Sequence, residues 1–176
     1  MSATTGSPAV DPAVFRAAMG LLPTAVSVVS AEEDGHPVAM VVGTLTSVSL
    51  DPPLIAVLPM RSSRSWARIA RTGGFVASVL SGHQRAVVER LSGRSDARFQ
   101  SVDWERSLCD GPAVAGSLAQ IDARIEAEHE AGDHDIVVAR VVAVRHRETA
   151  TPPLVFFRRG YHRTLPVEDS IPHGWY

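Results

Sequence analysis

The sequence predicts a mainly β fold, an antiparallel barrel or sandwich of about six or seven strands with about three short helices. Short β-branched or alternating apolar segments recur along the chain, and hairpin turns separate them. Helical periodicity is confined to three modest stretches. With 176 residues, 45% of them hydrophobic, the chain fits one domain around a single core.

The first forty residues predict a helix followed by a hairpin. Asp11 is placed to cap a short helix that has Pro12 in its first turn, and residues 1–10 are expected to be disordered. Residues 24–42 contain two β-branched apolar runs on either side of the turn sequence EEDGHP. This pattern predicts two paired strands.

The segment GTLTSVSLDPPLIAV, from Gly43 to Val57, is expected to continue the sheet. Residues 45–50 alternate in polarity, Asp-Pro-Pro makes a turn, and the apolar run that follows predicts a buried strand. The next segment, RSSRSWARIART, predicts a helix that a serine caps and that ends at Gly73 and Gly74.

Residues 75–112 predict a strand, a helix and a surface excursion. FVASVL is the strand, and SGHQRAVVERLSG is an amphipathic helix that Ser81 would cap and Gly93 would close. The region that follows is polar and is expected to be irregular, with Phe99 and Trp104 as its large apolar anchors.

The last third of the chain predicts three more strands. LAQIDARIEAEHEA and DIVVARVVAVRHRE alternate in polarity and are joined by the turn GDH. PLVFFRRGYHRTL then closes the sheet and leaves a C-terminal tail over residues 164–176.

Composition excludes several classes of function. A net charge of −2 argues against nucleic acid or an anionic membrane as a partner, and no apolar run is long enough to span a bilayer. All seventeen basic residues are arginines, which excludes Schiff-base chemistry and a lysine-dependent P-loop. The single Cys109 and the absence of a secretion signal indicate a cytoplasmic protein. Neither GxGxxG nor GxSxG is present.

Two neighbouring segments could together bind a planar anionic ligand. Serines and threonines at alternate positions of a strand are often simply solvent-facing, but those after Gly43 lie beside a turn and offer N–H and O–H donors. RSSRSW places Arg61, Arg64 and three serines at a helix start, which favours an anion, although a capped helix with solvated arginines would look the same.

The histidines near the GDH turn are candidates for a ligand contact. His129 and His134 lie near several carboxylates, but no third histidine is close and their spacing does not give a common ligand geometry, so no metal site is expected. His134 follows a tight turn and could donate to a ligand, or it could satisfy the local backbone. Arg158 and Tyr161, near the end of the last strand, would suit a phosphate-bearing aromatic ligand or could be solvated.

In their order along the chain, these motifs resemble the short-chain flavin reductases, which are built on the FMN-binding split barrel. FRAAMGLLPTAVSVVS, GTLTSVSLDPPLIAVLP, SSRSW, GGFVASVL, AGDHDIVVARV and PLVFFRRGY carry the resemblance. It implies a split barrel of Greek-key type that spans residues 1–176. It also implies an NAD(P)H:flavin oxidoreductase that reduces FMN or FAD and supplies a partner monooxygenase, with the flavin near a homodimer interface.

The resemblance also implies roles for individual residues. His134 would position the nicotinamide, together with Asp133, Arg158 and Tyr161 as contacts to the nicotinamide nucleotide. The expected flavin contacts are Pro37, Val41, Gly43, Thr44, Leu45, Thr46, Ser47, Ser49, Leu58, Pro59, Met60, Arg64, Ser65, Trp66 and Arg90. Of these, Arg64 and Ser65 would hold the flavin phosphate.

Several positions depart from the family pattern. Leu45 and Leu91 stand where Phe is frequent, and Ala25 and Ala139 stand where Gly is frequent. Gly43 stands where many relatives have Asn or Gln, so a backbone group would have to replace one side-chain contact. The same barrel could also hold flavin without reductase turnover, as a carrier, a sensor or a biosynthetic module. A third possibility is an interaction domain with no small ligand.

Overall fold

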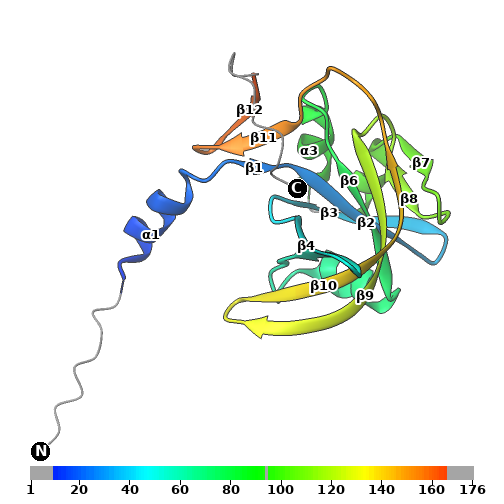
Figure 1. The fold of residues 1–176 in the computed structure, drawn as a ribbon, viewed down its shortest axis with the longest axis horizontal. Coiled ribbons are helices and arrows are strands. Elements are labelled where there is room, and N and C mark those ends of the chain that lie inside the picture. Colours follow the sequence, from blue (N-terminus) through cyan, green and yellow to red (C-terminus); the bar gives the residue numbers. More distant parts are fainter. Residues whose placement is uncertain (1–9, 94, 166–176) are drawn as a thin grey trace, which may run out of the picture.

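The computed structural model describes residues 10–93 and 95–165 and shows a β-barrel flanked by short helices (Figure 1). Seven strands form one antiparallel sheet in the order β3-β2-β6-β9-β10-β5-β4. Their bounds are β2 Ser27–Glu33, β3 His36–Val42, β4 Thr46–Leu50, β5 Pro53–Val57, β6 Gly74–Val79, β9 Ala119–Ala131 and β10 His134–His146. The prediction of a mainly β, antiparallel fold is confirmed.

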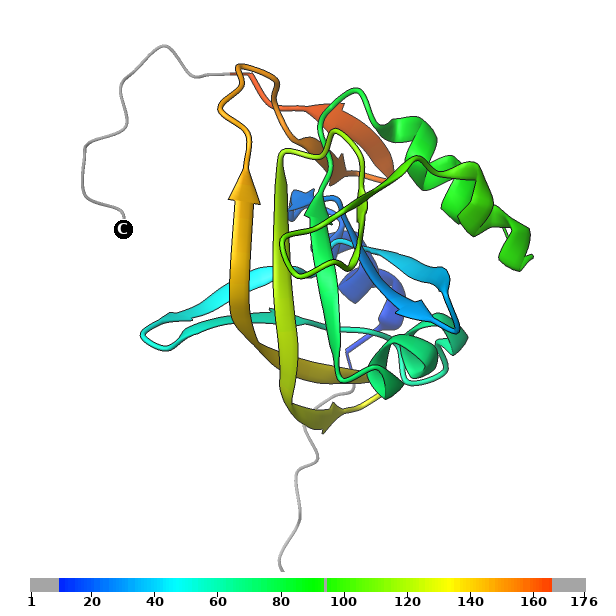
Figure 2. The ribbon, with the colours of Figure 1, turned by 90° about the vertical axis from the view of Figure 1, so that its right-hand side faces the viewer.

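A short connection shows why this sheet is a barrel. β3 and β4 are the two edges of the sheet, yet only residues 43–45 join them. Four Cα–Cα steps span at most about 15 Å, so the two edges must lie close together and the sheet must curl round. Figure 2 shows this curled sheet, with β9 and β10 crossing its front and the β4–β5 hairpin extending to one side.

Two predicted hairpins form as expected. Asp34 and Gly35 both have positive φ, 53° and 75°, which suits the tight turn between β2 and β3. Gly132, with φ 72°, and Asp133 turn the chain between β9 and β10, so His134 is the first residue of β10. The GDH turn is therefore where the sequence predicted it.

The C-terminal segment differs from the prediction of a single closing strand. It forms a hairpin of β11 Leu154–Phe157 and β12 Gly160–Arg163, which pairs with β1 Thr24–Ala25 in a separate three-stranded sheet. The turn residues Arg158 and Arg159 have positive φ, 47° and 64°. The absence of glycine or asparagine at both central turn positions hid this hairpin from sequence reasoning.

Helix α1, Pro12–Met19, has its expected N-cap, because the Asp11 side chain accepts a hydrogen bond from the Ala13 N–H at 2.7 Å. Helix α2, Arg64–Arg71, is capped by Ser63 as the sequence predicted. Among the residues the structure describes, no helix is long and apolar enough to cross a membrane. The expectations for residues 1–9 and 166–176 lie outside the described residues.

The expected cap of the third helix was wrong. Helix α3, Arg85–Leu91, begins after Gln84, four residues later than Ser81. Ser81 instead bridges to Pro153, and its N–H donates to the Gln84 side chain at 2.9 Å. Ser81 is therefore held at the end of the sheet and cannot act as the N-cap.

The region expected to be irregular contains regular structure. It holds a 3₁₀ helix, Asp96–Ser101, and a small hairpin of β7 Trp104–Arg106 and β8 Pro112–Val114. Phe99 is buried and the Trp104 indole donates to its carbonyl at 2.7 Å, so both are apolar anchors as predicted. Three-residue strands are too short to show a clear period in the sequence.

The core lies inside the barrel and beneath α2. Trp66 and Ile69 on α2 are buried, and Trp66 packs edge-on against Phe75 with ring centroids 6.2 Å apart. This packing orients α2 so that its first residues reach the barrel mouth near the β3–β4 connection.

Candidate functional site

Two neighbouring hollows at the barrel mouth share the lining residue Ser63, and together they are called the crevice here. The first, of about 240 Å³, is lined by Met40, Val41, Val42, Gly43, Thr44, Leu58, Met60, Ser63 and His134. The second, of about 390 Å³, is lined by Ser63, Arg64, Ser65, Arg68, Asp96 and Arg98. Gly43 and Thr44 are the first residues of the serine- and threonine-rich segment. They therefore lie next to the start of α2, which is rich in arginine and serine.

Gly43 and Thr44 shape the floor of the first hollow. The Thr44 hydroxyl accepts a hydrogen bond from the Leu58 N–H at 3.0 Å, which joins the β3–β4 connection to the end of β5. A Cβ on Gly43 would lie 2.8 Å from the Thr24 hydroxyl, closer than ordinary packing allows. The Thr24 side chain thus fills the space beside Gly43, which accounts for glycine at this position.

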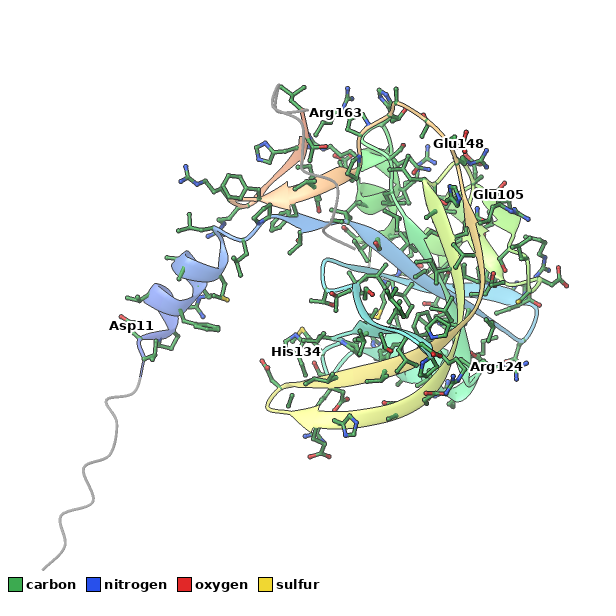
Figure 3. All side chains as sticks on the ribbon, in the orientation of Figure 1. Asp11, Glu105, Arg124, His134, Glu148 and Arg163 are labelled. Carbon is green, nitrogen blue, oxygen red and sulfur yellow. The ribbon has the colours of Figure 1, made fainter. Side chains whose placement is uncertain are left out.

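His134 stands at the tip of the β9–β10 hairpin, on the edge of the first hollow (Figure 3). Its side chain is 39% exposed, and its Nδ1 lies 2.7 Å from an Asp133 carboxylate oxygen. This hydrogen bond with His134 lowers the pKa of Asp133. Asp133 therefore orients the imidazole and leaves Nε2 free of that contact.

The segment after β5 holds the hairpin tip in place. Met60 bridges to His134, the Arg61 N–H donates to the Asp133 carbonyl at 3.0 Å, and the Asp135 N–H donates to the Pro59 carbonyl at 3.0 Å. Because these bonds are between backbone groups, the position of His134 relative to the crevice is set by the fold.

The start of α2 forms the polar end of the crevice. The Ser63 hydroxyl accepts a hydrogen bond from the Trp66 N–H at 3.2 Å and caps the helix. The N–H groups of Arg64 and Ser65 lie in the first turn, which has no intrahelical acceptors, and the helix dipole adds positive potential there. With the Arg64 guanidinium, this end of the crevice suits a phosphate.

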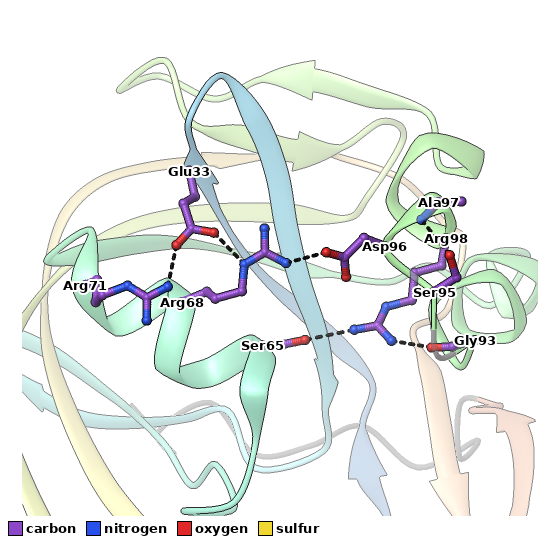
Figure 4. A network of polar contacts seen from close by, with 9 residues as sticks. All are labelled: Glu33, Ser65, Arg68, Arg71, Gly93, Ser95, Asp96, Ala97 and Arg98. Carbon is purple, nitrogen blue, oxygen red and sulfur yellow. Dashed lines mark hydrogen bonds and ion pairs between the residues drawn. The ribbon is translucent and has the colours of Figure 1, made fainter.

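An arginine network extends this polar end toward the 3₁₀ helix (Figure 4). Glu33 accepts from Arg68 at 2.5 Å and from Arg71 at 2.6 Å, and Arg68 also pairs with Asp96 at 3.0 Å. The two arginines lower the pKa of Glu33, and Glu33 raises that of Arg68.

Arg98 joins the same network to the helix start. Its guanidinium donates to the Ser65 hydroxyl at 2.9 Å and to the Gly93 carbonyl. Arg68 and Arg98 were missed by sequence reasoning. Arg68 could have been found as the residue one helical turn after Arg64, but Arg98 lies 33 positions from Ser65 and has no local signal.

Several residues of the predicted site lie outside the crevice. Trp66 and Pro59 are buried, Leu45 packs against the core, and Arg90 is exposed on α3. Pro37 stands near the start of β3, at the opposite end of that strand from Gly43. Thr46, Ser47 and Ser49 continue along β4, where Thr46 and Ser47 are exposed.

Arg158 and Tyr161 lie in two other hollows. Tyr161 lines a hollow of about 180 Å³ that also includes Thr24, Val41 and Gly43, so it adjoins the crevice through the β3–β4 connection. Arg158 lines a separate hollow of about 440 Å³ between the β11–β12 turn and α1.

Comparison with known proteins identifies the family of this chain. The model of the flavin reductase like domain matches residues 19–165. The chain belongs to the flavin reductase-like family. The barrel and the crevice at its mouth both lie within the matched residues.

Individual relatives agree with this assignment. A reductase subunit of a flavin-dependent monooxygenase from Rhodococcus jostii is 34% identical over 180 residues, which is 99% of this chain and 91% of the relative. A flavin reductase from Pseudomonas putida is 42% identical over 154 residues, or 87% of this chain and 90% of the relative.

Solved structures give the same result. Nitrilotriacetate monooxygenase component B from Mycobacterium thermoresistibile superposes with a TM-score of 0.86 at 33% identity, covering 93% of this chain and 92% of that one. An NADH:FAD oxidoreductase from Streptomyces globisporus, solved with NAD and FAD fragments, superposes with a TM-score of 0.83 at 29% identity over 93% of this chain and 100% of that one.

Proposed function

We propose that this protein is an NAD(P)H:flavin oxidoreductase that reduces FMN or FAD and supplies the reduced flavin to a partner monooxygenase. The observation that carries the proposal is the junction at Ser63 of an apolar hollow and a cationic one. A flavin has the same division, an apolar ring and a phosphate tail. The names of the relatives, which include monooxygenase reductase subunits, support the same function.

The residues present fit a flavin phosphate at the cationic end. Arg64 supplies a guanidinium, Ser63 and Ser65 supply hydroxyls, and the first turn of α2 supplies N–H groups. Arg98 would act on the same group indirectly, because it holds the Ser65 hydroxyl in position.

The apolar hollow fits the ring system. Val41, Leu58 and Met60 supply apolar surface, and Gly43 and Thr44 bring the backbone close because position 43 has no side chain of its own. The volume of this hollow, about 240 Å³, is slightly below the volumes usual for cofactor sites. With the second hollow included, the volume of the crevice falls within the usual range. The exposed residues of β4 extend this surface beyond the hollow.

The flavin, when bound, supplies the redox chemistry, because its ring accepts the hydride that NADH or NADPH donates. The protein orients the two ring systems and excludes water from between them. N–H groups at the β3–β4 connection would stabilise negative charge on the ring. His134, held by Asp133, would position the nicotinamide from the other side of the hollow.

The role of His134 gives a specific kinetic expectation. His134→Ala should raise the KM for the nicotinamide nucleotide more than it weakens flavin binding, since the residue stands away from the phosphate end. His129→Ala is the matched control, because His129 is exposed on the neighbouring strand β9 and lines neither hollow. Loss of flavin with an unchanged nucleotide KM would contradict this role.

We further propose that the protein is a homodimer. Helix α1 projects from the barrel and buries none of its residues in the chain (Figure 1). Its apolar side chains are exposed, including Val14 at 62% and Phe15 at 55%. An eight-residue helix is too short to be stable alone in water, so a second copy that covers this face would stabilise it.

The assay that tests the proposed activity is nicotinamide oxidation by the purified protein. NADH and NADPH are each supplied with FMN, FAD or riboflavin, and absorbance at the nicotinamide band is followed. We expect flavin-dependent oxidation of at least one nucleotide. A protein that binds flavin but oxidises neither nucleotide at saturating flavin would be a carrier or sensor, and a protein that does not bind flavin would be an interaction domain.

A further inference from the structure

Another cavity lies on the outer surface of the barrel, away from the crevice. It has a volume of about 300 Å³ and lies between strands β2, β6 and β9 and the loop that joins β7 to β8. It shares no lining residue with the crevice. Figure 3 shows Arg124, on its rim, on the opposite side of the barrel from His134.

The floor of this cavity is a row of three paired residues. Val76 on β6 lies between Ser30 on β2 and Asp122 on β9 in the strand register. Paired residues of neighbouring strands point to the same face, so all three face the β7–β8 loop.

The β7–β8 loop covers this row of residues and is hydrogen-bonded to it. The Ser30 hydroxyl donates to the Pro112 carbonyl at 2.6 Å, and the Ser107 hydroxyl donates to Oδ1 of Asp122. A Cβ at Gly111 would lie 2.5 Å from the Val76 side chain, so the loop touches the floor there. Two hydrogen bonds and one close contact therefore hold residues 107–112 against the sheet.

One carboxylate oxygen of Asp122 accepts no hydrogen bond. The residue is 4% exposed, and none of the residues that the structure describes donates a hydrogen bond to its buried Oδ2. A buried carboxylate oxygen without a donor is costly. Oδ1 already accepts from Ser107, which leaves Oδ2 as the unpaired acceptor of this lining residue.

The lining defines the class of that molecule. The Asp122 carboxylate disfavours an anion, whereas Glu32 is already paired with Arg106 at 2.6 Å. Val76 and Val142 offer apolar contact. Among the described residues no three His, Cys, Asp or Glu side chains are grouped as metal ligands, which favours an N–H donor over a metal ion. Arg124 stands exposed at the rim, so a cationic head would have to pass it to reach Asp122.

We propose that this cavity is a binding site for a small organic cation, a primary ammonium or guanidinium group with a short apolar body, and that Oδ2 of Asp122 accepts its N–H. Such a charge-assisted hydrogen bond satisfies the unused oxygen, and the apolar walls cover the body of the ligand. The site is independent of the crevice, so it can be tested whether or not the protein reduces flavin.

Cys109 allows a direct test, because it is the only cysteine of the chain and lines the cavity. Its thiolate attacks a symmetric disulfide, one sulfur joins Cys109 as a mixed disulfide, and the other leaves as a free thiol. The protein is equilibrated with equal amounts of the disulfides of cysteamine, 2-mercaptoethanol and thiocholine. Intact-protein mass spectrometry then gives the ratio of the adducts.

We expect the cysteamine adduct to exceed the other two by about tenfold, which is the ratio that about 1.4 kcal/mol gives. Thiocholine carries the same charge without an N–H, so it separates hydrogen bonding from simple attraction. In Asp122→Asn, which presents an amide in place of the carboxylate, the preference should fall below about twofold. Asp110→Asn, next to Cys109 on the exposed loop, should keep it.

Equal adducts in the wild-type protein would overturn the proposal, and so would a cysteamine preference that thiocholine shares. A preference that persists in Asp122→Asn would overturn the role of that residue. If Asp122→Asn does not fold, the wild-type comparison at 0.05 and 0.5 M NaCl decides, because a buried contact keeps its preference at high salt and a surface attraction loses it.

Discussion

The Thr44 hydroxyl and the Leu58 N–H are joined by a 3.0 Å hydrogen bond that closes the barrel beneath the crevice. β3 and β4 are opposite edges of the sheet, and Thr44 lies in the connection between them, whereas Leu58 follows β5. The bond therefore fixes the two segments that form the floor of the apolar hollow. Substitutions at Thr44 should act on the shape of the hollow.

Thr44→Val should weaken flavin binding by about fivefold, because it removes the acceptor of the Leu58 N–H while keeping the side-chain volume, a loss of about 1 kcal/mol. Thr44→Ser keeps the hydroxyl and should bind nearly as the wild type does. Quenching of flavin fluorescence on titration measures both. Equal affinities in Thr44→Val and the wild type would show that this bond does not shape the site.

Arg64→Gln should weaken FMN binding by about tenfold and leave riboflavin binding unchanged, because riboflavin has no phosphate. Arg147→Gln, exposed after β10 and paired with Glu105 at 3.1 Å, is the matched control. Isothermal titration of the wild type and both variants with each flavin gives the six affinities. An equal loss for riboflavin would place Arg64 away from the phosphate.

Glu33→Gln should lower the free energy of unfolding near neutral pH, and the difference from the wild type should vanish in acid. Arg68 and Arg71 lower the pKa of Glu33 below 4.5 in the folded protein. Its stabilisation is therefore present above about pH 4.5 and is lost as the pH falls through the lowered pKa. Urea unfolding at pH 7 and in acid measures the difference in the free energy of unfolding between the variant and the wild type. Glu89→Gln is the control for a single surface pair. A difference that does not depend on pH would contradict this origin.

Phe15→Asp should convert the proposed dimer to a monomer, because a carboxylate would be buried where the second copy covers α1. Leu108→Asp is the control, since Leu108 is as exposed as Phe15, 55% in each case, but lies on the β7–β8 loop. Sedimentation equilibrium gives the mass of each. A monomeric wild-type protein, or a dimer that survives Phe15→Asp, would argue against this interface.

Much of the fold could be predicted from local patterns. The turns at Gly35 and Gly132 and the caps Asp11 and Ser63 involve residues close in sequence, and each has a specific local chemistry. The C-terminal hairpin could not be predicted, because two arginines occupy its positive-φ turn positions. Ser81 has the chemistry of a cap, but it bridges to Pro153, which is 72 positions away and precedes β11.

The residues of the candidate site also fall into two groups, those that local sequence patterns predicted and those that only the fold brings to the site. Gly43, Thr44, Arg64 and Ser65 were predicted as neighbours of one ligand, and the structure brings all four to the crevice. Thr24 could not be found from the sequence, because it reaches Gly43 only when the barrel closes. Arg98 could not be found either, because it reaches Ser65 only through the fold of the 3₁₀ helix. Their roles depend on tertiary contacts that leave no periodic signal.

We propose that one crevice holds the flavin, with its phosphate at the start of α2 and its ring against the β3–β4 connection. A crystal structure of the protein with FMN tests this most directly. We expect the phosphate within hydrogen-bond distance of Ser65 and Arg64, and the ring beside Gly43 and Thr44 on the side that His134 faces. FMN bound elsewhere, or with its phosphate away from Ser65 and Arg64, would contradict the account.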